Sequence, residues 1–122
     1  MTLNYLDFEY SEDTEGIGTF DAMASVGAAQ AGAVYAEVEQ VLAWAARHFG
    51  HECGPLDEGF EWHHDLQAQQ DFTVNEHPVF DPLSGRVRTQ TGQAGAPRYT
   101  VTLSISGSSA FCEALRAQFD LD

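Results

Sequence analysis

Lysine is absent from this sequence, and basic residues of any kind are few. The 122 residues include five arginines against 19 aspartates and glutamates, which gives a formal net charge of −14 at pH 7. A surface of this charge repels nucleic-acid phosphates and anionic lipid headgroups, so we expect neither as a partner. It attracts basic proteins and speeds their encounter, although solubility alone would explain the same charge.

Long hydrophobic runs are also missing. No stretch of 18 apolar residues occurs, so we expect no membrane-spanning segment. The first residues, MTLNYLDFEYSED, carry acids where a signal peptide carries basic residues and then an apolar block. We therefore expect a cytoplasmic protein. With 43% hydrophobic residues, the chain can bury about two-thirds of its surface as a single domain, residues 1–122.

Cysteine is scarce, and the common catalytic and nucleotide-binding motifs are absent. Cys53 and Cys112 can form at most one disulfide, and we expect both to be reduced in the cytoplasm. Cys53 lies in an acidic loop and Cys112 on an apolar stripe, and neither setting activates a thiolate. No Walker A loop, G-x-G-x-x-G or G-x-S-x-G occurs. The sequence therefore predicts no catalytic residue and no cofactor.

Hydrophobic periodicity predicts the helices and strands. Residues 28–49 form the clearest helix, because their apolar positions repeat at about 100° per residue and Gly50 follows as a C-cap. A shorter helix is expected to begin after Gly107 with a serine cap and an apolar stripe of Phe111, Cys112, Leu115 and Phe119. Alternating apolar and polar residues predict strands over residues 4–10, 19–26, 60–74, 86–91 and 98–106.

The predicted element order is ββαβββα. Alternating strands with one polar face are typical of an antiparallel sheet that is open to water on one side. We expect an α+β fold, a two-layer sandwich with an antiparallel sheet of about five strands and two helices on one face. The strand over 60–74 is long enough to require a bend or a bulge. Residues 92–97 are expected to form a flexible connector.

The stretch 60–74 contains two adjacent histidines, His63 and His64, followed by Asp65. In a strand the two rings point to opposite faces, so they cannot share a metal ion. His64 points inward and is expected to be a core histidine with a hydrogen-bond partner. His63 points outward between Glu61 and Asp65. It belongs either to a solvated strand face or to an acid–base pair with those carboxylates.

Two segments invite a metal-binding interpretation. His48, His51 and Cys53 lie close in sequence, but a structural zinc site needs four ligands at defined separations. SEDTEGIG, residues 11–18, places Ala22 where an EF-hand loop needs a bidentate acid. We therefore predict no metal ligands.

Trp44 lies about 120° from the centre of the apolar stripe of helix 28–49. It is either half exposed, as a hot spot for a partner, or packed against the loop over residues 51–59. The sequence leaves both alternatives open.

The sequence favours a small acidic protein-interaction module without catalytic activity. It would bind a basic protein, as an inhibitor or immunity protein does, or pair with itself through the open sheet face. The alternative is a small enzyme or ligand-binding protein that uses His63 with Glu61 and Asp65, and a second alternative is a metal-binding protein. The residues expected to contact a partner are Glu12, Asp13, Glu15, Trp44, Glu61, His63 and Asp65.

Overall fold

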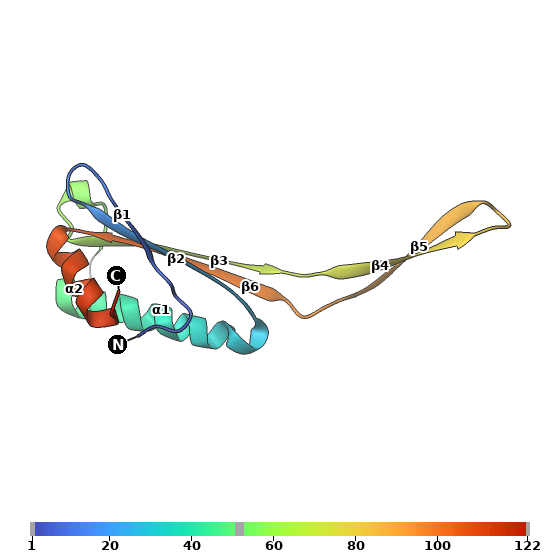
Figure 1. Ribbon diagram of the computed structural model, residues 1–122, viewed down its shortest axis with the longest axis horizontal. Helices are drawn as coiled ribbons and strands as arrows, with labels where there is room; N and C mark the ends of the chain where they lie inside the picture. Colours follow the sequence, from blue (N-terminus) through green and yellow to red (C-terminus); the bar gives the residue numbers. More distant parts are fainter. Residues whose placement is uncertain (1, 51–52, 122) are drawn as a thin grey trace.

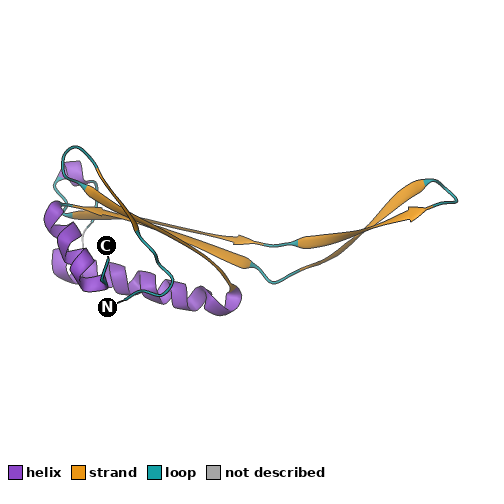
Figure 2. Cartoon of the chain, in the orientation of Figure 1, coloured by secondary structure: helices purple, strands orange, loops and turns teal. Residues whose placement is uncertain are grey.

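The computed structural model describes residues 2–50 and 53–121, which form a body and a long projecting ribbon (Figure 1). The body contains a four-stranded antiparallel sheet in the order β1-β2-β6-β3 and two helices, and the ribbon pairs β4 with β5 (Figure 2). The elements are β1 (Glu9–Glu12), β2 (Gly18–Gly27), α1 (Ala28–Phe49), a short 3-10 helix η1 (Leu56–Glu58), β3 (Trp62–Asp71), β4 (Val74–Asp81), β5 (Arg86–Ala94), β6 (Arg98–Gly107) and α2 (Ser109–Phe119).

The α+β class, the order of the elements and the antiparallel pairing agree with the sequence prediction. The predicted strand over 60–74 divides, because strand pairing stops at Asp71 and begins again at Val74 in β4, which runs to the turn at 82–85. The chain therefore forms a four-stranded and a two-stranded sheet instead of one sheet of about five strands. The predicted strand 86–91 extends to Ala94, so the expected flexible connector shortens to residues 95–97. No helix in the described part of the chain is long and apolar enough to cross a membrane.

Strand β6 is the centre of the body, because it pairs with β2 on one side and with β3 on the other. Its inward residues, Val101, Leu103 and Ile105, are fully buried. They lie opposite the buried residues of β2, which are Ala24, Ala22 and Phe20. The small side chains of Ala22 and Ala24 on β2 leave room for the helices. The buried residues of β2 and β6 together form the face of the sheet on which the core is built, which we call the floor of the core.

Both helices cover this floor from the same side (Figure 1). Helix α1 has the predicted bounds, and α2 buries its predicted stripe. The side-chain oxygen of Ser108 accepts a hydrogen bond from the Phe111 backbone N–H at 3.3 Å, which caps α2. Both helices pack mainly on β2 and β6, and only the start of β3 reaches the helical layer, where the Trp62 ring stacks on Phe111 of α2 at a centroid distance of 5.9 Å.

A buried carboxylate, rather than strand pairing, fixes the N-terminal segment. The predicted strand over residues 4–10 begins only at Glu9, because the backbone N–H groups of Asn4, Tyr5 and Leu6 donate to the Glu37 carboxylate instead. These bonds are 2.8 to 3.2 Å long, and Glu37 is only 8% exposed. The carboxylate thereby satisfies three backbone donors that a packed chain could not leave unpaired, and Leu6 enters the core.

We expect Glu37→Ala to lower the free energy of unfolding by about 2–4 kcal/mol, because it leaves one buried and two partly buried backbone donors without an acceptor. Urea denaturation followed by circular dichroism measures this loss. Glu39→Ala is the matched control, since Glu39 is exposed on the same helix and its removal is expected to change stability by less than about 0.5 kcal/mol. Equal stabilities of the two variants would show that Glu37 does not hold the segment.

Candidate functional site

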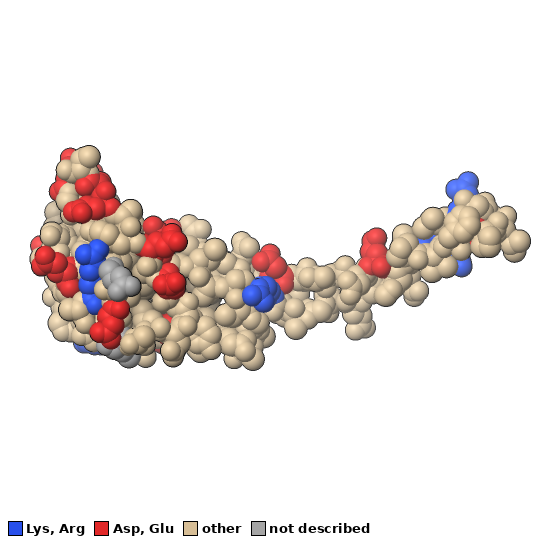
Figure 3. Space-filling model, viewed as in Figure 1, with Lys and Arg blue, Asp and Glu red and all other residues tan. Residues whose placement is uncertain are grey.

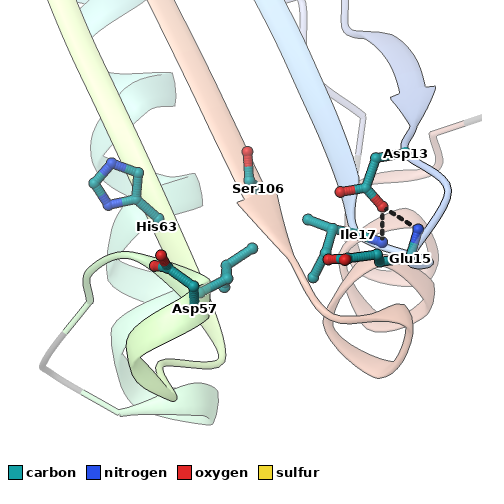
Figure 4. Close-up of a pocket in the computed structure, with 7 residues that line it drawn as sticks. Asp13, Glu15, Ile17, Asp57, His63 and Ser106 are labelled. Atoms are coloured by element: carbon teal, nitrogen blue, oxygen red, sulfur yellow. Dashed lines mark hydrogen bonds between the residues drawn. The ribbon is translucent and has the colours of Figure 1, made fainter.

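A hollow of about 390 Å³ lies at the end of the body opposite the ribbon (Figure 4). We call it the acidic hollow. It is lined by Asp13, Glu15, Ile17, Leu56, Asp57, His63 and Ser106. Three predicted contact residues, Asp13, Glu15 and His63, therefore lie together there, although they are up to 50 residues apart in sequence.

The β1–β2 loop brings the acids to one wall of the hollow. The Asp13 side chain accepts hydrogen bonds from the backbone N–H groups of Glu15 and Ile17, both at 2.9 Å. This closes the turn, and it makes Asp13 a structural residue of the loop. Glu15 and Asp57 are exposed on either side of the hollow.

His63 lies on the outward face of β3, opposite Ser106 of β6, as the alternation predicted. Its neighbouring carboxylates bond to other groups. The Glu61 carboxylate accepts from the Ser108 hydroxyl at 2.7 Å, and the Asp65 carboxylate accepts from the Gln67 amide at 2.9 Å. No hydrogen bond within the described residues joins His63 to a carboxylate. None of the other predicted contact residues near this end lines the hollow: Glu61 lies just before β3, Asp65 lies on β3 and Glu12 lies on β1.

His64 points inward, where its ring stacks on Trp62 at a centroid distance of 5.6 Å. Its Nδ1 lies 3.3 Å from the Cys53 thiol, which is the hydrogen-bond partner that a core histidine requires. Burial of the ring, together with the nearby His63, lowers the pKa of His64 below its usual value of 6.5. His64 is therefore a packed residue that favours its neutral form.

The predicted metal-binding candidates do not converge. The His48 ring lies 2.9 Å from the Trp44 carbonyl oxygen, and Cys53 faces His64. His51 lies outside the described residues. Across residues 2–50 and 53–121, no group of three or more His, Cys, Asp or Glu side chains could hold a metal ion.

The structure does not leave Trp44 half exposed. Its side chain is 5% exposed and packs between the helices, with the rings of Phe111 and Phe119 at centroid distances of 6.1 and 5.8 Å. Trp44 is a core residue of the α1–α2 interface, so it is not available as a surface hot spot. Of the two alternatives that the sequence left open, half exposure was wrong, because α2 covers a second side of α1.

The sequence analysis missed the most unusual surface of the molecule, which is the ribbon. Six large apolar side chains on it are at least 45% exposed, and Leu83 at the tip is 98% exposed; they are Phe72, Val74, Val79, Phe80, Leu83 and Val87. The segment HPVFDPLSGRV gave one sign of this exposed surface. Apolar residues lie on both sides of its turn, and no amphipathic segment that could cover them is nearby in sequence.

Charge is divided sharply between the two parts of the molecule. Residues 72–97 hold two acids, Glu76 and Asp81, and two arginines, Arg86 and Arg88, so this segment is neutral. The body therefore carries the whole net charge of −14. Figure 3 shows acidic side chains over the body and mostly uncharged atoms along the ribbon.

The chain matches no protein-family model, no curated protein and no solved structure in sequence or fold comparisons.

We expect acidification to destabilise the protein through His64. The unfolded chain protonates His64 near pH 6.5, whereas the folded chain does so only at lower pH. The stability contributed by neutral His64 is thus fully present above the unfolded pKa and is lost as the pH falls below about 6.5. Urea denaturation midpoints at pH values of about 7.5 and 5.5 should fall less in His64→Asn than in the wild type.

The control for this titration is His77→Asn, because His77 is exposed on the ribbon. It should show the same loss of stability on acidification as the wild type. If His64→Asn loses as much stability between the two pH values as the His77 variant, the titration of His64 does not contribute.

Proposed function

We propose that this chain is a non-catalytic protein-interaction module and that the projecting ribbon is its contact element. The observation that carries the proposal is the set of large apolar side chains exposed along β4 and β5. Exposed apolar surface of this extent on a soluble protein marks an interaction site, since burying each such side chain stabilises a complex by about 1.5–3 kcal/mol.

The construction of the ribbon supports this role. An isolated two-stranded hairpin is marginally stable in water, and β4 and β5 pair only with each other. Phe80 and Val87 face each other across the ribbon and are 61% and 62% exposed, so they cover each other only in part. A partner surface would bury this pair and order the ribbon at the same time.

The strong charge of the body complements the apolar ribbon. Charged surfaces steer encounter and exclude wrong partners, whereas apolar anchors provide most of the affinity. The acidic hollow is less suited to acid–base catalysis, because the two carboxylates nearest His63 in sequence, Glu61 and Asp65, accept hydrogen bonds from Ser108 and Gln67. A protein partner with basic groups beside an apolar surface fits both parts of the molecule.

A photo-crosslinking residue in place of Leu83 tests the proposal directly. In cells that express the protein natively, we expect covalent adducts with one protein from the ribbon tip. The same residue at Met23, which is 68% exposed on the open face of β2, is the matched control and should give few adducts. Equal yields at both positions, or none at the tip, would contradict a contact role for the ribbon.

We also expect the double substitution Phe80→Ser and Val87→Ser to weaken partner binding by at least about tenfold, since it removes one apolar pair. The melting temperature of the body should stay nearly constant, because neither side chain contacts the core. Met23→Ser should leave binding unchanged. Binding by titration calorimetry and melting by circular dichroism separate the two effects, and an unaltered affinity of the double variant would argue against the ribbon.

A further inference from the structure

Resting on the proposed function of the ribbon, we propose that its partner is a second copy of this chain. In this arrangement, two copies exchange ribbons around a two-fold axis. The ribbon of each copy lies along β3 of the other, and its tip reaches the acidic hollow of the other body.

Strand β3 offers the receiving surface. Among the described residues it pairs with β6 on one side only, and on its other edge the Trp62 carbonyl accepts a hydrogen bond from the Gly54 backbone N–H, so this edge is free from His63 to Asp71. Beyond His64 its inward face is also uncovered, because the helices pack mainly on β2 and β6. Leu66 shows this directly, since it points inward, opposite the buried Leu103, and is still 39% exposed. An uncovered edge strand with an exposed apolar residue is a site where another chain can add.

The lengths of the two segments match. β3 comprises residues 62–71, and the strand continues through residues 72–81 to the tip of the ribbon. Two antiparallel copies related by an axis near the junction of these segments therefore place each ribbon beside the other copy's β3, over about 33 Å at 3.3 Å per residue. Such a contact is reciprocal, so it closes at two copies and leaves no ribbon free.

Charge favours the same orientation. The arginines of the ribbon, Arg86 and Arg88, follow the tip turn directly. In the antiparallel arrangement they arrive at the beginning of the other copy's β3, where Glu15 and Asp57 flank the acidic hollow. The two bodies, each strongly negative, lie at opposite ends of the pair, so that their repulsion is small.

The exposed surface of the chain is large enough to form an interface with a second copy. The chain exposes 7996 Å², whereas a compact monomer of 13.3 kDa exposes about 6,450 Å². The excess of about 1,500 Å² is nearly twice the roughly 800 Å² that each partner buries in a standard interface. A second copy can cover this excess without any other protein.

Sedimentation equilibrium of the purified chain gives the first test. We expect twice the monomer mass at micromolar concentration. A monomer at concentrations up to about 100 μM, or an open series of larger assemblies, would overturn the reciprocal exchange.

Charge reversal gives the second and sharper test. One variant carries Arg86→Glu and Arg88→Glu at the tip, and another carries Glu15→Arg and Asp57→Arg at the hollow; Asp13 is kept because it holds the loop. Each variant alone brings like charges together, so its dimer should be weakened about 10- to 100-fold. An equimolar mixture should restore a heterodimer, since both tip–hollow contacts are then complementary. Failure of the mixture to recover the dimer would refute the proposed docking.

A control for net charge uses Glu39→Arg with Glu113→Arg, two exposed helix positions outside the proposed contact. This variant changes the charge as much as the hollow variant does, and it should remain dimeric. Dissociation of the control to the same degree would show that net charge, rather than docking, sets the association.

The outcome of crosslinking from residue 83 separates this inference from the proposed function. An adduct with a peptide of the same chain near Asp57 supports both. An adduct with a different protein, from a chain that is monomeric when purified, keeps the contact role of the ribbon and rejects the second copy. The absence of any adduct from the ribbon rejects both.

Discussion

The limited width of the helical layer is the constraint on which the rest of this structure depends. Two helices cover the paired strands β2 and β6, whose inward side chains are buried beneath them. No helix remains for β3 beyond Trp62 or for the far half of the long hairpin that β3 and β6 begin. Two strands can continue to pair beyond the end of the core, because backbone hydrogen bonds between strands need only a neighbouring strand. The ribbon of β4 and β5 is this continuation.

The parts of the fold that the sequence could predict are those where periodicity and burial coincide. Helix α1, the inward row of β6 and the serine cap of α2 all combine a local signal with a place in the core. The ribbon was not predicted as a projection, because apolar–polar alternation looks the same whether its apolar side meets a helix or water. The N-terminal strand was placed too early for a related reason, since its alternation gave no sign that Glu37 would take its backbone donors.

The candidate site follows the same logic. The alternation placed His63 outward and His64 inward, and the structure agrees on both. What sequence could not supply was the tertiary approach of the β1–β2 loop and η1, which brings Glu15 and Asp57 to the same end of the sheet as His63. Trp44 shows the opposite case, in which a residue that looked peripheral on one helix is central once the second helix packs against it.

A projecting apolar ribbon is a hazard as well as a contact element, because free strand edges can pair without limit. This ribbon carries features that oppose open-ended pairing. Pro78 removes one backbone donor from β4, and Arg86 and Arg88 place two positive charges on β5. Stacked, in-register copies would bring these like charges together, whereas a reciprocal pair separates them and sets them against acids. The same side chains therefore disfavour aggregation and favour a closed contact of defined size.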